Sequence, residues 1–116
     1  MSFAVARASE PVTPAEKSRI AEIASAFAGE IDAINVFGSR ASGTARRGSD
    51  LDLILSGPIT LHDMLKLGAA FEESDLAFKI DLLHERDLID PEVRDHILRQ
   101  AKPLLSGDAL RKIARP

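Results

Sequence analysis

The sequence predicts an α/β fold, a small mixed β-sheet flanked by helices in the order α-β-α-β-α-β-α. Two observations predict it: apolar residues recur at helical spacing in three segments, and shorter apolar or alternating runs typical of strands lie between them. The chain has 116 residues, the length of one domain, which we place over residues 1–116. A chain of this size can bury one hydrophobic core.

The first half of the chain contains one predicted helix and two predicted strands. Thr13 can cap a helix, and Glu16 completes a capping box with it. From Ile20 onward, apolar residues recur at i, i+3, i+4 and i+7, which gives the helix one apolar face. Residues 31–37 form a short apolar run suited to a buried strand. In residues 50–56 leucines alternate with polar residues, the pattern of a half-buried strand.

The second half repeats this alternation of helix and strand. Thr60 can cap an amphipathic helix, and residues 76–83 alternate as a strand. The last helix begins after Asp90 and ends before Pro103, since the residue before a proline is pushed out of the helical region. A helix joins the second and third strands, so we expect them to be parallel with a right-handed crossover. Residues 106–116 are expected to form a short basic tail.

The composition excludes several classes of protein. The chain has no cysteine, which rules out a disulfide scaffold, a thiolate zinc site and a cysteine nucleophile. Its net charge of −3 argues against a protein that coats nucleic acid. The first residues lack the apolar stretch of a signal peptide, and no run approaches the length that spans a membrane. We therefore expect a cytoplasmic protein.

Three aspartates form the strongest chemical signal in the sequence. Asp50 and Asp52 are two residues apart on a predicted strand, so both carboxylates face the same side. Asp81 lies on the next predicted strand, opposite in parity to the apolar residues. Like-charged carboxylates repel, and Mg²⁺ removes the repulsion, so the three together suit a two-metal site for phosphoryl or nucleotidyl transfer. The alternative for an Asp-x-Asp pair alone is a solvated strand face.

The loop before these aspartates is rich in glycine and serine. Gly38 and Ser39 follow directly on the first strand, and a glycine-containing helix start can aim backbone N–H groups at an anion. The loop is not a P-loop, because no Lys-Ser/Thr pair follows its second glycine. Taken singly, these glycines fit a turn and the arginines a solvated loop. The loop contains no acidic residue, and its positive charge comes from Arg40, Arg46 and Arg47.

The run from Val36 to Leu53 resembles the signature of the minimal nucleotidyltransferases, members of the DNA polymerase beta-like nucleotidyltransferase superfamily. That signature is Gly-Ser, a short spacer and then Asp-x-Asp on a strand. Ile80-Asp81-Leu82 resembles the position of its third carboxylate. The resemblance covers residues 14–105, nearly the whole chain, and implies the nucleotidyltransferase fold. One departure is Ser42, where the family commonly has a basic residue.

The resemblance implies a cofactor, a substrate and roles for particular residues. Family members bind Mg²⁺, with two ions possible, and a nucleoside triphosphate, usually ATP. They transfer a nucleoside monophosphate to a hydroxyl group. Asp50 and Asp52 would hold the metal ions, and Asp81 would complete the metal site or help to deprotonate the hydroxyl. The candidate residues for binding the nucleotide phosphates are Gly38, Ser39, Arg40, Arg47 and Ser49.

The resemblance also implies a partner. Many of these small proteins are antitoxins in a complex with a HEPN-domain toxin ribonuclease, and some add AMP to a tyrosine of that toxin. The chain contains no tyrosine, so a tyrosyl-AMP that it makes must form on its partner. Two alternatives remain open: an antitoxin that only occludes its partner, and a transferase acting on a small molecule such as an antibiotic. No direct binding of nucleic acid is expected at a pI of about 5.6.

Overall fold

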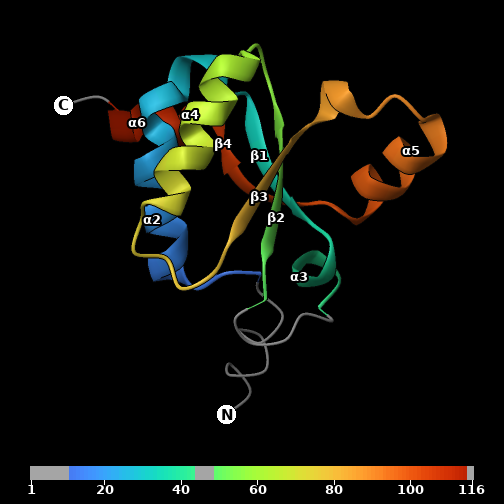
Figure 1. The fold of residues 1–116 in the computed structure, drawn as a ribbon, viewed down its shortest axis with the longest axis horizontal. Coiled ribbons are helices and arrows are strands. Elements are labelled where there is room, and N and C mark those ends of the chain that lie inside the picture. Colours follow the sequence, from blue (N-terminus) through green and yellow to red (C-terminus); the bar gives the residue numbers. More distant parts are fainter. Residues whose placement is uncertain (1–10, 44–48, 115–116) are drawn as a thin grey trace.

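The computed structural model describes residues 11–43 and 49–114. Figure 1 shows a β-sheet with helices α2, α4 and α6 on one side and α3 and α5 on the other. The α/β class and the mixed sheet flanked by helices are as predicted. The elements in chain order are α2 (Pro14–Ala24), the 3₁₀-helix η1 (Ser25–Glu30), β1 (Ala33–Phe37), α3 (Ser39–Ser42), β2 (Leu51–Ser56), α4 (Leu61–Glu72), β3 (Ile80–His84), the 3₁₀-helix η2 (Glu85–Asp87), α5 (Pro91–Gln100), β4 (Lys102–Ser106) and α6 (Gly107–Ala114).

The four strands lie in the order β3-β2-β1-β4. Strand β1 pairs antiparallel with β2 and with β4, whereas β2 and β3 are parallel. Helix α4 connects β2 to β3, so the parallel pair predicted from the helical connection is confirmed. Strand β3 is the outermost strand on its side of the described sheet.

Side-chain caps fix the starts of the main helices. The Thr13 hydroxyl accepts a hydrogen bond from the Glu16 N–H at 3.1 Å, and the Glu16 carboxylate accepts one from the Thr13 N–H at 2.8 Å. This reciprocal pair is the predicted capping box. Thr60 likewise caps α4 by accepting from the Asp63 N–H at 3.1 Å, and Asp90 caps α5. The predicted helix starts are therefore confirmed.

The core lies between the sheet and the layer formed by α2, α4 and α6. Alternate residues of β2, Leu51, Leu53 and Leu55, are at most 1% exposed, and Ile34 and Val36 of β1 are fully buried. Because successive residues of a strand point to opposite faces, the residues between these leucines face the other side of the sheet. The same alternation that forms the core thus carries Asp52 to the opposite face.

The third strand is shorter than predicted. The sequence pattern indicates a strand over residues 76–83, but only Ile80–His84 pairs with β2. Leu76 and Phe78 pack against the core without strand pairing. Their alternation therefore reflects burial of apolar side chains rather than hydrogen bonding in the sheet.

The C-terminal segment differs from the prediction, which has three strands, ends with the helix before Pro103 and treats residues 106–116 as a basic tail. Lys102–Ser106 forms strand β4 at the edge of the sheet, where a proline is tolerated because its missing N–H need not pair. The pairing with β1 shifts between Ile34 and Asn35, a bulge that lets consecutive Leu104 and Leu105 both be buried.

Helix α6 completes this segment and joins the core. Leu110 is fully buried, and the guanidinium of Arg111 donates a hydrogen bond to the Ala28 carbonyl at 3.2 Å. None of the helices in the described ranges is both long enough and apolar enough to span a membrane.

Candidate active site beside the paired aspartates

Two of the three predicted aspartates lie side by side. In the parallel pair of β2 and β3, Asp52 is the direct partner of Asp81. Neighbouring strands are about 4.8 Å apart, so the two side chains share one face at adjacent positions. Asp50 lies just before the start of β2. The register therefore brings together carboxylates that are 29 residues apart in the sequence.

The electrostatics of the site centre on the Asp52 carboxyl. Burial raises the pKa of the half-buried Asp52 carboxyl, and the negative charges of Asp81 and Asp50 raise that pKa further. Asp81 is more exposed and has a cation beside it, because the Lys79 ammonium lies 3.6 Å from its carboxylate. The ionised form of Asp52 is thus held at a cost in free energy that a further positive charge would relieve.

Gly38 closes one side of the site. Strand β1 ends at Phe37, which pairs with Asp52, so the next residue passes directly by the Asp52 carboxylate. Gly38 has a φ of 74°, in a region that favours glycine, and a Cβ at this position would collide with Asp52 Oδ2. The glycine is therefore required both for the backbone conformation and for the close approach to Asp52.

Arg40 is held by the protein itself. Its guanidinium donates two hydrogen bonds to the Ser49 carbonyl, at 2.6 and 3.1 Å, and one to the Pro11 carbonyl at 3.0 Å. It also lies over the Phe78 ring, 4.2 Å from the centroid. In this position Arg40 supports the segment that leads into Asp50. A phosphate could contact only those guanidinium N–H groups of Arg40 that do not take part in these hydrogen bonds.

The other predicted phosphate-binding residues are placed differently. Ser39 begins the short helix α3 directly after Gly38, and Ser42 ends it. The Ser49 hydroxyl is buried and has no hydrogen-bond partner among the described residues. Arg47, like Arg46, lies outside the described residues. The phosphate-binding roles of this group stay predictions.

The carboxylates suit a divalent cation in their chemistry, although their side chains are not arranged around one. Within the described ranges, no three His, Asp or Glu side chains converge as a metal site. Asp81 is directed to Lys79, whereas Asp52 faces adjacent negative charge in a half-buried position. Hard oxygen ligands with mutual repulsion are what Mg²⁺ binds, so Asp52 and Asp81 fit it by their chemistry.

His84 is close to Asp81 in the sequence but has a structural role. It is 4% exposed, and its Nε2 lies 2.8 Å from the Gly57 carbonyl. Its Nδ1 accepts a hydrogen bond from the Arg86 N–H at 3.0 Å. Nε2 therefore ties the end of β3 to the turn after β2, and Nδ1 caps η2.

The contacts of Arg40 were not predictable from sequence spacing. Pro11 lies 29 residues before Arg40, and Phe78 lies 38 residues after it. The sequence shows only a positive charge in a loop without acidic residues. This pattern fits an anion-binding residue as well as it fits a residue that supports the loop. A supporting role becomes visible only when the fold brings these distant segments together.

Comparison with known proteins assigns the chain to a family. A family model described as Polymerase beta, Nucleotidyltransferase matches residues 18–110, most of the chain. The chain belongs to this nucleotidyltransferase family. A solved structure described as a candidate minimal nucleotidyltransferase is 36% identical, with a TM-score of 0.61. The match covers 78% of this chain and 90% of that chain. The protein is thus a transferase of the nucleotidyltransferase kind.

Two further solved structures share the fold at lower identity. One is a toxin–antitoxin complex with AMP-PNP, 23% identical with a TM-score of 0.61, and the other is a mutant of the toxin–antitoxin pair MntA–HpeT, 19% identical with a TM-score of 0.59. Each match covers 84% of this chain and 80% of the other. Among curated proteins, none matches the chain.

Proposed function

We propose that this protein is a Mg²⁺-dependent nucleotidyltransferase that moves AMP from ATP to a hydroxyl group of a partner protein, and that it acts as an antitoxin. The acceptor we propose is a tyrosine of a HEPN-domain toxin. The observation that carries the proposal is the direct pairing of Asp52 with Asp81, with Gly38 passing beside Asp52, in a chain of the nucleotidyltransferase family.

The proposed reaction needs few groups from the protein. The acceptor oxygen forms a bond to the α-phosphorus, the bond from that phosphorus to the bridging oxygen breaks, and pyrophosphate leaves with the electron pair. The proton of the hydroxyl passes to a carboxylate, a role that we assign to Asp81 because it is more exposed than Asp52. When bound, Mg²⁺ supplies positive charge to the phosphate oxygens.

The remaining residues position this chemistry. Asp52 contributes a carboxylate whose pKa is raised by burial and by the negative charges of Asp81 and Asp50, and a cation beside it would offset both effects. Gly38 leaves open the space that any side chain would fill. Arg40 supports the segment before Asp50 through the Ser49 carbonyl.

The proposed partner is supported by fold likeness and by composition. Two solved structures with this fold come from toxin–antitoxin pairs, and one of them contains AMP-PNP, a nucleotide analogue. The chain itself has no tyrosine, so a tyrosine acceptor has to belong to another protein.

The test is transfer of label from radiolabelled ATP to the co-purified partner in the presence of Mg²⁺. Asp52→Asn should lower the rate by at least roughly 10²-fold, the size expected for loss of a group acting on the reacting atoms. The control is Asp95→Asn, an exposed aspartate on α5 with the same change of charge, which should transfer at the original rate. Undiminished transfer by Asp52→Asn contradicts the proposed site.

A cellular measurement separates catalysis from occlusion. Cells that produce the partner are protected by the native chain, and Asp52→Asn should protect them poorly if AMP transfer is the means of protection. Equal protection by Asp52→Asn, with equal amounts of folded protein, means that binding alone neutralises the partner.

A further inference from the structure

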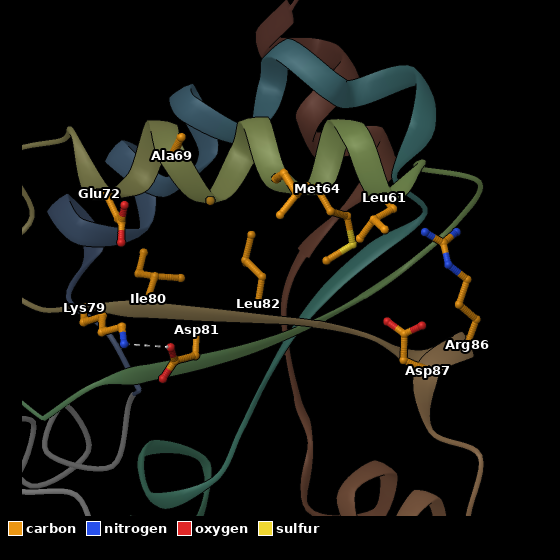
Figure 2. A pocket seen from close by; sticks show the side chains of 12 residues that line it. Leu61, Met64, Ala69, Glu72, Lys79, Ile80, Asp81, Leu82, Arg86 and Asp87 are labelled. Atoms are coloured by element: carbon orange, nitrogen blue, oxygen red, sulfur yellow. Dashed lines mark ion pairs between the residues drawn. The ribbon is translucent and has the colours of Figure 1, made fainter.

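A hollow of about 480 Å³ lies between α4 and the outer strand β3. Figure 2 shows apolar side chains from the helix and the strand meeting across it. The hollow is open on the side where no described strand continues the sheet. Its apolar lining comes from Leu61, Met64, Leu65, Ile80 and Leu82. We call this surface, with its charged rim, the β3-edge groove.

Two features of the groove are unusual for a free surface. Leu61 and Leu65 are 69% and 66% exposed, and because they are four residues apart they lie on the same face of α4. Beside them, β3 is an edge strand, and half of its backbone N–H and C=O groups point away from β2. Exposed leucines next to a strand edge that no described strand covers indicate a surface that is covered by a protein partner.

The shape of α4 fits a second copy of itself. The large Leu61 and Leu65 lie in the first half of the helix, and the small Gly68 and Ala69 lie in the second half. A Cβ added at Gly68 would have only Leu82 within 4 Å, so there is room above this position. In an antiparallel pair of α4 helices, the leucines of each copy lie over the small residues of the other.

The charges at the rim match the same arrangement. Glu72 and Lys79 lie at one end of the groove, and Arg86 and Asp87 lie at the other (Figure 2). A two-fold axis perpendicular to the sheet places each end of the groove against the opposite end of the groove in the second copy. Glu72 then faces Arg86 of the second copy, and Lys79, which is paired with Asp81 in its own chain, lies at the end that meets Asp87. Glu72, Arg86 and Asp87 form no ion pair within the part of the chain that the structure describes.

We propose that the β3-edge groove binds a second copy of this chain, with the β3 strands antiparallel and the α4 helices side by side. The contact is isologous, because each copy gives the same surface and receives the same surface. It extends the sheet across the two copies and removes an exposed strand edge. Asp52 lies on the face of the sheet opposite α4 and stays outside the contact, whereas Asp81 also lines the groove, so the dimer contact borders the proposed active site.

The first test is the mass of the purified chain in solution, measured by sedimentation equilibrium. The native chain should be a dimer. Leu65→Lys should raise the dissociation constant at least roughly tenfold, because it places a like charge at both copies of one symmetric contact. The control is Ile89→Lys, since Ile89 is 90% exposed and lies outside the groove. That variant should stay dimeric, with the same circular dichroism as the native chain.

The second test reverses the proposed ion pair. Glu72→Arg and Arg86→Glu should each weaken the dimer, and the double variant should restore it, because the charges again match across the two-fold axis. A monomeric native chain overturns the proposal. So does a Leu65→Lys chain that dimerises like the native one, or a double variant no tighter than the single ones. AMP transfer by these variants is measured separately, so the proposal on function stands or fails independently.

Discussion

The two faces of the sheet are built from the same strands but carry different properties. On the face toward α2 and α4, Leu51, Leu53 and Leu55 of β2 are almost completely buried. On the other face Asp52, in the same strand, has a pKa raised by burial and by neighbouring carboxylates. One face therefore stabilises the fold, and the other holds charge that weakens it. Truncating a buried leucine should lower stability, whereas neutralising Asp52 should raise it.

The largest expected effect on stability is on the apolar face. Leu53→Ala removes a fully buried side chain from the centre of β2, and we expect a loss of about 2–5 kcal/mol in the free energy of unfolding. The cost combines lost burial with the cavity that the smaller side chain leaves. Urea denaturation followed by circular dichroism measures it.

A matched control is Val93→Ala on α5, where the side chain is 48% exposed. This change should stay within about 0.5 kcal/mol, as is usual for surface substitutions. If the two variants lose similar stability, the contrast between the faces is wrong.

The second-largest expected effect is at Gly38, where the end of β1 passes beside Asp52. Gly38→Ala should cost about 1–3 kcal/mol, the range for residues forced into disfavoured backbone regions, and it should also reduce nucleotidyl transfer. The reason is the collision of the new Cβ with the Asp52 carboxylate. Stability is measured by urea denaturation and transfer by the labelled-ATP assay.

Gly43→Ala is a comparison variant in which the new Cβ meets no neighbour. Gly43 has a φ of 79°, close to that of Gly38, but nothing lies within 4 Å of a Cβ placed there. Gly43 is in the left-handed helical region with a ψ of 11°, whereas the ψ of Gly38 is −153°, in a region that is essentially restricted to glycine. Gly43→Ala should therefore have a smaller backbone cost and no collision, and should lose less transfer than Gly38→Ala. Equal loss of transfer by both variants would show that the contact with Asp52 is unimportant.

Local patterns in the sequence predicted the features that depend on neighbouring residues. The capping box of Thr13 and Glu16 is a four-residue motif, and the alternation in β2 is a property of six consecutive residues. The parallel pairing of β2 and β3 follows from the helix between them, and it is this pairing that sets Asp52 beside Asp81. The central part of the candidate site was therefore predictable in outline.

Features that depend on distant contacts were not predictable. Strand β4 contains Pro103 and two adjacent leucines, so it lacks an alternating pattern and is held only by pairing with β1. The support of Arg40 by Pro11 and Phe78 joins three separate segments. The ion pair of Lys79 with Asp81 depends on side-chain directions that the sequence suggests but does not determine.

The smallest expected effect is on the acidic face, where a substitution should raise stability instead of lowering it. Asp52→Asn should raise the stability of the metal-free protein at neutral pH, by at most about 1 kcal/mol for a partly solvated charge. The pKa of Asp52 is raised in the folded state, so the folded protein takes up this proton before the unfolded chain as the pH falls. The native chain thereby gains stability relative to the variant. The advantage of Asp52→Asn should shrink on acidification, as urea denaturation with a chelator can measure.

Asp75 provides the opposite case on the surface. Its hydrogen bond and ion pair with Arg19 lower the pKa of Asp75, so its ionised form stabilises the fold and that contribution is lost as the pH falls. Asp75→Asn should therefore lower stability at neutral pH, with a deficit that shrinks on acidification. If both variants shift stability in the same direction at neutral pH, Asp52 is not held against its neighbours' charge. Relief of that repulsion by a cation would then lose its physical basis.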